Sequence, residues 1–154
     1  MANPNVYVAA PLFSVWERER NERFGRVLQK AGYNPLLPQE INAPTLEDGK
    51  LDMQVVFSEC VRLLDEADAV VAFCEGPDVD SGTAWELGYA TAKGISSLCV
   101  RTDLRRAEGG SPANIMLCLG ATEVLDMPSY HGKPQDINAA IIKALGGIVY
   151  GDTV

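Results

Sequence analysis

The chain has 154 residues and a formal net charge of −8 at pH 7, which fits one domain with one hydrophobic core. The negative charge argues against a nucleic-acid polymer as partner, because polyphosphate binding needs a basic face. No apolar run approaches the ~20 residues that span a bilayer, and no signal peptide is evident. We therefore expect a cytoplasmic protein with no membrane partner.

Cysteine and histidine usage limits the possible chemistry. The four cysteines form no CxxC pair, and His131 is the single histidine, so we expect neither a metal site nor a bound cofactor. Reduced and mostly buried thiols are the simplest interpretation. A single histidine also disfavours a Ser-His-Asp or Cys-His site.

The first third of the chain alternates strand and helix patterns. Residues 6–10 form an apolar run of strand length, and residues 14–31 place their apolar side chains at helical spacing. Gly32 is well placed to end this helix. Residues 33–37 predict a second strand, and the proline-containing stretch 38–50 predicts a loop.

The remaining residues continue the alternation. Apolar side chains between 53 and 64 follow helical spacing, and the unbroken apolar run 69–73 is typical of a strand buried on both faces. The later predicted elements are a helix over 83–93, a strand over 96–100, a short helix over 114–119, a strand over 122–125 and a helix over 135–145.

This order predicts a single α/β domain over residues 1–154. We expect a doubly wound parallel sheet of flavodoxin or Rossmann-like type, with about five strands and helices on both faces. Ligands of such sheets bind beyond the carboxyl ends of the strands, which here means residues 9–13, 38–42 and 74–86. The glycine-rich dinucleotide and triphosphate motifs are missing.

The stretch 76–90 carries the most informative carboxylates. Asp78 and Asp80 precede a predicted helix whose first turn contains Glu86. A helix N-terminus favours an ionised carboxylate, as a nucleophile requires. The sequence Thr83-Ala84-Trp85-Glu86 is equally a capping-box pattern, in which Glu86 only bonds to the backbone of Thr83. Taken alone, Asp80 is a cap or loop residue, and Tyr7 is a core residue.

The pattern Asp80-x-Gly82-Thr83-x-x-Glu86-x-Gly88-x-Ala90 resembles the signature of the nucleoside 2-deoxyribosyltransferase family. Three further segments are similar in order and position, and the resemblance covers about residues 7 to 116. These segments are Tyr7-Val8-Ala9-Ala10-Pro11-Leu12-Phe13, Pro35-Leu36-Leu37-Pro38-Gln39 and Asn114-Ile115-Met116.

The resemblance implies a role for each matching residue. Glu86 would attack C1′ of deoxyribose and form a covalent intermediate, which a second nucleobase, or water, would resolve. Tyr7 would orient Glu86. Asp80 would hold the sugar hydroxyls together with Asn114 from a partner subunit, and Met116 would pack against the sugar or base. Gln39 and Phe13 would lie near the base, and Gly82 would also be a substrate-binding residue. The protein would be a homodimer or higher homo-oligomer with shared active sites.

Cys60 departs from the pattern. The family commonly places an acidic residue or its amide at this position, where it faces the base. A thiol is a poor replacement for a carboxylic acid at neutral pH. Cys60 also lies on the apolar stripe of its predicted helix, which makes a packing role an alternative.

Two other functions remain open from the sequence. One is hydrolysis of 2′-deoxynucleoside 5′-monophosphates, in relatives that place a small hydroxyl residue at the position of Asp80. A carboxylate there would repel a phosphate dianion by about 1 kcal/mol or more, which favours nucleosides. The other is a non-catalytic module that senses a nucleoside; Cys60 supports it, and the presence of both Tyr7 and Glu86 opposes it.

Overall fold

The computed structural model describes residues 2–128 and 131–151. Within these residues, a five-stranded parallel sheet has the strand order β2-β1-β3-β4-β5, which confirms the predicted doubly wound α/β fold. The strands are β1 (Asn5–Ala9), β2 (Asn34–Leu36), β3 (Ala69–Phe73), β4 (Ser96–Arg101) and β5 (Glu123–Asp126).

The helices alternate with the strands as the sequence predicts. They are α1 (Val15–Lys30), α2 (Met53–Asp65), α3 (Ser81–Lys93), α4 (Ile115–Gly120) and α5 (Pro134–Tyr150). Helix α1 begins with a capping box, in which Ser14 and Glu17 each accept from the other's backbone N–H. Two short 3₁₀ turns, Pro38–Glu40 and Glu108–Gly110, lie in the loops after β2 and β4.

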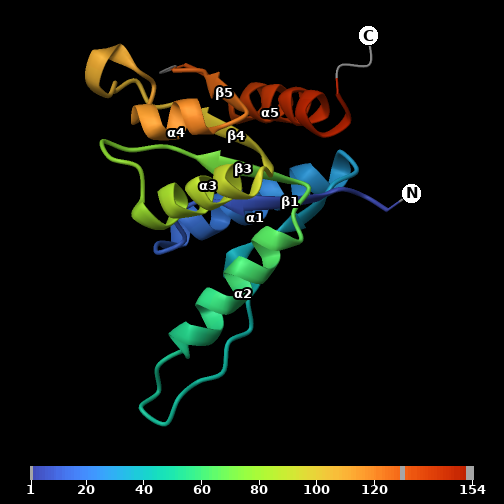
Figure 1. The fold of residues 1–154 in the computed structure, drawn as a ribbon, viewed down its shortest axis with the longest axis vertical. Helices are drawn as coiled ribbons and strands as arrows, with labels where there is room; N and C mark the ends of the chain where they lie inside the picture. The colour runs from blue at the N-terminus through green and yellow to red at the C-terminus, as the bar shows by residue number, and fades with distance from the viewer. Residues whose placement is uncertain (1, 129–130, 152–154) are drawn as a thin grey trace.

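Helices cover both faces of the sheet (Figure 1). Because side chains alternate along a strand, Val6 and Val8 point into the core under α1 and α5. Tyr7 and Ala9 point into a second core that includes side chains of α2 and α3. The chain crosses from one side of β1 to the other between β2 and β3, and this reversal marks the expected ligand position.

Two helix bounds differ from their predicted positions by two residues or more. Helix α3 begins at Ser81, two residues before the predicted start, because Asp80 caps it. Helix α5 continues to Tyr150, five residues beyond its predicted end. No helix in the described ranges is long and apolar enough to cross a membrane.

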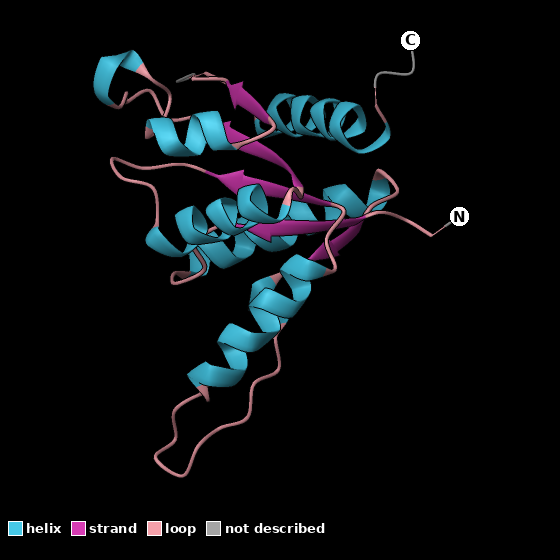
Figure 2. Cartoon of the chain, viewed as in Figure 1, coloured by secondary structure: helices cyan, strands magenta, loops and turns pink. Residues whose placement is uncertain are grey.

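Helix α2 and the loop before it extend away from the body of the molecule (Figures 1 and 2). Leu64, near the end of α2, is its only fully buried residue. Met53 and Phe57, nearer its start, are exposed. The end of α2 that joins β3 is therefore packed on the sheet, whereas its first two turns are not.

Glycine is required where α3 ends and not inside it. Gly94 has φ +70° and closes the helix in the left-handed region, whereas a Cβ on Gly88 would meet no atom within 4 Å. We predict that Gly94→Ala lowers the free energy of unfolding by about 1 kcal/mol and that Gly88→Ala raises it by about 0.5–1 kcal/mol. Thermal melts of both variants beside the unmodified protein check this, and equal shifts would contradict the backbone argument.

Candidate active site

A partly buried hydrogen bond joins the first strand to helix α3. Tyr7, on β1, has no exposed surface, and its hydroxyl donates to Oε1 of Glu86 at 2.6 Å. The two residues are 79 positions apart in sequence. The bond lies where the strand order reverses, which is the predicted position for a ligand.

The start of α3 excludes the capping interpretation of Glu86. Asp80 is the N-cap, and its Oδ2 accepts from the backbone N of Thr83 at 2.9 Å and from the Thr83 hydroxyl at 3.1 Å. Glu86 is thus in the second turn of the helix rather than the first. Its carboxylate bonds to Tyr7 and not to the backbone of Thr83.

Asp80 and Gly82 shape the entrance to this helix. Capping occupies Oδ2 of Asp80, while Oδ1 has no hydrogen-bond partner among the described residues. A Cβ on Gly82 would lie 3.2 Å from Oδ2 of Asp80. Glycine at this position therefore gives the capping carboxylate room, and the second oxygen of Asp80 stays available to a ligand.

Burial dominates the electrostatics of Glu86. It raises the pKa of Glu86 to about 7, and repulsion from Asp80 acts in the same direction. The hydrogen bond from Tyr7 opposes both effects and lowers the pKa. The helix N-terminus was expected to keep Glu86 ionised, but Glu86 lies one turn too far along α3 for the full effect. The same burial raises the pKa of Tyr7 above its usual range, so Tyr7 remains a neutral donor.

Cys60 joins the pair from helix α2. Its thiol is half-buried, and the Tyr7 hydroxyl and the Glu86 carboxylate both affect its titration. Burial raises the pKa of Cys60, and the hydrogen bond with Tyr7 lowers it. Cys60 therefore lies close enough to Tyr7 and Glu86 to interact with both, and its role opposite a base stays a prediction.

Gln39 and Phe13 lie in loops at the same edge of the sheet. Nε2 of Gln39 donates to the backbone oxygen of Arg18 at 3.0 Å, and Oε1 of Gln39 is buried without a hydrogen-bond partner in the described structure. The Phe13 side chain is 78% exposed. Neither side chain has a hydrogen bond to Tyr7 or Glu86, so their role at a base stays a prediction.

Asn114 and Met116 lie at the start of α4, which contacts α3, and Asn114 lines a pocket together with Asp78 and Val79. Asn114 caps α4, accepting from the backbone N of Met116 at 2.9 Å. Met116 is 78% exposed. Neither residue has a hydrogen bond to Tyr7, Glu86 or Asp80 within the described ranges, so their role at a substrate stays a prediction.

The sequence interpretation missed Arg101. This arginine is 2% exposed at the end of β4, and it donates to the backbone oxygens of Cys74, Gly76 and Arg105 at 2.6, 2.8 and 3.0 Å. It fixes the loop that leads to Asp80. An arginine that directly follows an apolar strand is the signal that could have identified it, since a buried guanidinium needs several acceptors.

The described residues offer no group of three or more His, Cys, Asp or Glu side chains that could hold a metal ion. All four cysteines lie in the described ranges and are free thiols, and Cys74 and Cys99 are buried. The site therefore consists of a carboxylate with a raised pKa, a neutral phenol, a thiol and a capping aspartate. Such a set can attack an electrophilic carbon and bind sugar hydroxyls.

Comparison with known proteins identifies a family and two structures of similar fold. A model of the nucleoside 2-deoxyribosyltransferase family matches residues 6–116. A conserved protein from Enterococcus faecalis V583 has a TM-score of 0.69 at 22% identity, covering 94% of this chain and 100% of its own. The 2-deoxyribosyltransferase of Bacillus psychrosaccharolyticus has a TM-score of 0.66 at 20% identity, covering 86% and 95%. No curated protein sequence matches the chain.

The two solved structures share the fold, and the family model covers most of the chain, including Tyr7, Asp80, Glu86 and Asn114. On these grounds the chain belongs to the nucleoside 2-deoxyribosyltransferase family.

Proposed function

We propose that this protein cleaves the N-glycosidic bond of 2′-deoxynucleosides and transfers the deoxyribosyl group to another nucleobase, or to water. The observation that carries the proposal is the 2.6 Å hydrogen bond between the Tyr7 hydroxyl and Glu86. It fixes one carboxylate oxygen and leaves the other, Oε2, without a hydrogen bond within the described ranges. A positioned oxygen of this kind suits attack on C1′ of a sugar.

The reaction takes two displacements. Glu86 attacks C1′, the N-glycosidic bond breaks, and its electron pair goes to the base nitrogen, which takes up a proton. The nitrogen of a second base then attacks C1′ and loses a proton, and Glu86 leaves as a carboxylate. Two inversions retain the configuration at C1′, as in retaining glycosidases.

Tyr7 and Asp80 support these steps in different ways. Tyr7 orients Glu86 and favours its ionised form through the hydrogen bond. Asp80 presents Oδ1 to the sugar hydroxyls while Oδ2 holds the helix. We assign no side chain to protonation of the leaving base, because the Cys60 thiol is a weak donor whose pKa burial raises further.

The negative charge near the sugar favours neutral substrates over monophosphates. Burial is the main cause of the raised pKa of Glu86, and repulsion from Asp80 adds to it. A phosphate dianion beside Asp80 would add a repulsion of about 1 kcal/mol even in a high dielectric. Parallel assays with deoxynucleosides and their 5′-monophosphates test the choice, and faster cleavage of the monophosphates would reverse it.

Replacing the nucleophile tests the proposal directly. We predict that Glu86→Ala folds but loses transfer activity by about three orders of magnitude, equivalent to about 4 kcal/mol in the barrier. Chromatography of deoxynucleosides incubated with and without an acceptor base measures this. Glu22→Ala, which removes an exposed carboxylate of α1, is the matched control and should retain activity.

Trapping distinguishes nucleophilic attack from simple binding. A 2-fluoro-2-deoxynucleoside should leave a glycosyl adduct on the unmodified protein and none on Glu86→Ala, as judged by mass spectrometry of the intact chain. An adduct of equal yield on the variant would remove Glu86 from the nucleophile role. No adduct and no cleavage on the unmodified protein would support a nucleoside-binding module instead.

The pH dependence reports on Tyr7. Glu86 must be ionised to attack, so kcat/KM should rise with pH through the Glu86 pKa of about 7 and then level off. Tyr7→Phe removes the hydrogen bond that lowers this pKa, so the rising limb should move to higher pH and the plateau should fall. Tyr89→Phe is the matched control, because Tyr89 donates to Asp65 and not to Glu86. A large drop in melting temperature with an unchanged profile would make Tyr7 a core residue only.

We further propose that the active unit is a homodimer or larger homo-oligomer with shared sites. Met116 is exposed together with Ile115 and Leu119 on the short helix α4, and Asn114 stands at its start. An exposed apolar surface of this kind marks an interaction site. A symmetric pair would place this segment of each subunit at its partner's Glu86.

Subunit mixing tests the shared site. We predict that inactive Glu86→Ala and inactive Asn114→Ser chains regain activity when mixed, because one site of a mixed pair carries neither substitution. Serine keeps the helix cap that Asn114 provides, so loss of activity in Asn114→Ser cannot be assigned to a lost cap. Differently tagged chains verify exchange. Complete exchange without recovered activity, or an active monomer by light scattering, would refute the shared site.

A further inference from the structure

A cavity of about 460 Å³ lies on the face of the sheet opposite to Glu86. Its lining combines aromatic side chains of α1 and β3 with polar side chains of α1, of the loops that follow β3 and β4, and of the start of α5. Phe24 and Phe73 belong to the core under α1 and α5, whereas Tyr7 belongs to the other core. The volume falls within the range of small-molecule sites, about 300–1,000 Å³.

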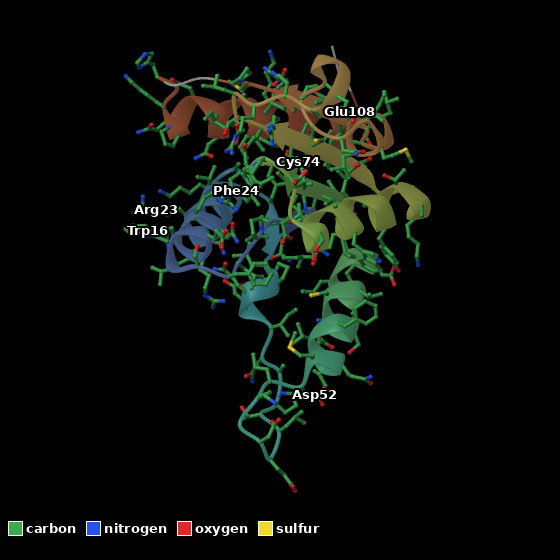
Figure 3. The ribbon with its side chains drawn as sticks, turned by 90° about the vertical axis from the view of Figure 1, so that its left-hand side faces the viewer. Trp16, Arg23, Phe24, Asp52, Cys74 and Glu108 are labelled. Atoms are coloured by element: carbon green, nitrogen blue, oxygen red, sulfur yellow. The ribbon has the colours of Figure 1, made fainter. Side chains whose placement is uncertain are left out.

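Three aromatic side chains line the cavity, and one of them, Trp16, is not packed in the core. Phe24 and Phe73 pack edge to face, with ring centroids 5.1 Å apart. Trp16 lies on the same side of α1, as Figure 3 shows for Trp16, Arg23 and Phe24, and it is 78% exposed. A large exposed indole at the rim of a cavity is suited to stack on a planar ring.

Arg20 supplies a charge that lacks an ionic partner. Its guanidinium lies 4.9 Å from the Phe73 ring centroid, and its Nε and Nη2 both donate to Oδ1 of Asn21. Arg20 forms no ion pair within 4 Å among the described residues. Its other N–H groups have no acceptor there, and burial lowers its pKa. A partly desolvated cation with unused donors favours an anionic ligand.

The two carboxylates that line the cavity, Glu75 and Glu19, form no ion pair with Arg20. Glu75 accepts from the backbone N and hydroxyl of Thr102 and from the backbone N of Asp103. Glu19 pairs with Arg23 on the surface of α1. Both groups are engaged elsewhere, although Glu75 is close enough to interact electrostatically with Arg20.

The start of helix α5 adds a second favourable element for an anion. Pro134 and Ile137 line the cavity, and within the described residues no side chain caps this helix. Its positive end therefore faces the same cavity as Arg20. Asn138, also in the lining, has no side-chain hydrogen bond in the described structure, so its amide can pair with the edge of a heterocycle.

We propose that this cavity is a second ligand site, separate from the deoxyribosyl-transfer site, for a small planar ring that carries one carboxylate or phosphate group. The ring would stack on Trp16, and the anionic group would bind Arg20 near the start of α5. The proposal does not depend on the reaction at Glu86, which lies across the sheet.

Binding of defined probes tests the proposal. Orotate and phenyl phosphate carry a ring and an anion, whereas uracil lacks the anion and inorganic phosphate lacks the ring. We expect the first two to shift the amide NMR signals of Phe24, Phe73 and Thr102 and to leave those of Tyr7 and Glu86 unchanged. Comparison of orotate with phenyl phosphate identifies the preferred anion. Uracil and inorganic phosphate should each bind at least about tenfold more weakly.

Matched variants test whether the anionic probes bind in this cavity or elsewhere on the protein. Arg20→Met should weaken orotate and phenyl phosphate about tenfold or more, and Trp16→Ala about fivefold. Arg26→Met, on the same helix and paired with Glu22, and Glu86→Ala should leave the affinity unchanged. If Arg20→Met fails to fold, Trp16→Ala decides, because that side chain is largely exposed. The proposal is overturned if neither anionic probe shifts the cavity signals at about 10 mM, or if Glu86→Ala and not Arg20→Met abolishes binding.

Discussion

The hydroxyl of Tyr7 can bond to Glu86 only because β1, an inner strand of the sheet, lies beside helix α3, which follows β3. The bond spans 79 positions of sequence at 2.6 Å, and it requires the parallel register between β1 and β3 and the start of α3 at Ser81. Burial makes the pair chemically unusual, since it raises the pKa of both partners. The hydrogen bond is the interaction that keeps the Glu86 carboxylate partly ionised near neutral pH.

The loop between β3 and α3 must be rigid for this geometry to persist. Arg101 binds two backbone oxygens of the loop, those of Cys74 and Gly76. Glu75 binds donors of Thr102 and Asp103 on the neighbouring strand end. Charged side chains thus cross-link the carboxyl ends of two strands, and hydrogen bonds to charged groups are the stronger class of such contacts. Substrate-binding loops on rigid supports are typical of α/β folds.

The outer surface of helices α2 and α3 carries exposed apolar side chains beside the site. Trp85 stacks on Tyr89 and meets Phe57 edge to face, with centroids 5.3 and 5.7 Å apart. Phe57 and Met53 are exposed on the part of α2 that leaves the body of the molecule. Helix α2 also carries Cys60 to Tyr7. Any contact that changes the position of α2 would therefore change the surroundings of Glu86.

The sequence alone determined the order and type of the secondary structure, because apolar runs and helical spacing are local properties. It placed all five strands within two residues of their ends and predicted the parallel sheet. It also predicted Asp80 and Glu86 as site residues through a family signature whose spacing is itself local, and Tyr7 through a separate segment that resembles the family's first strand. The pairing of Tyr7 with Glu86 was implied by the resemblance, since nothing in the residues between them specifies it.

Only the tertiary structure decided the roles that depend on distant neighbours. Whether Glu86 caps its own helix or faces a buried phenol depends on Asp80 occupying the cap and on β1 lying beneath α3. The helix N-terminus was expected to keep the Glu86 carboxylate ionised, but burial raises its pKa to about 7. Arg101 and the cavity beside Arg20 escaped sequence analysis for the same physical reason. The burial of a side chain and its hydrogen bonds depend on many residues that come together only when the chain folds.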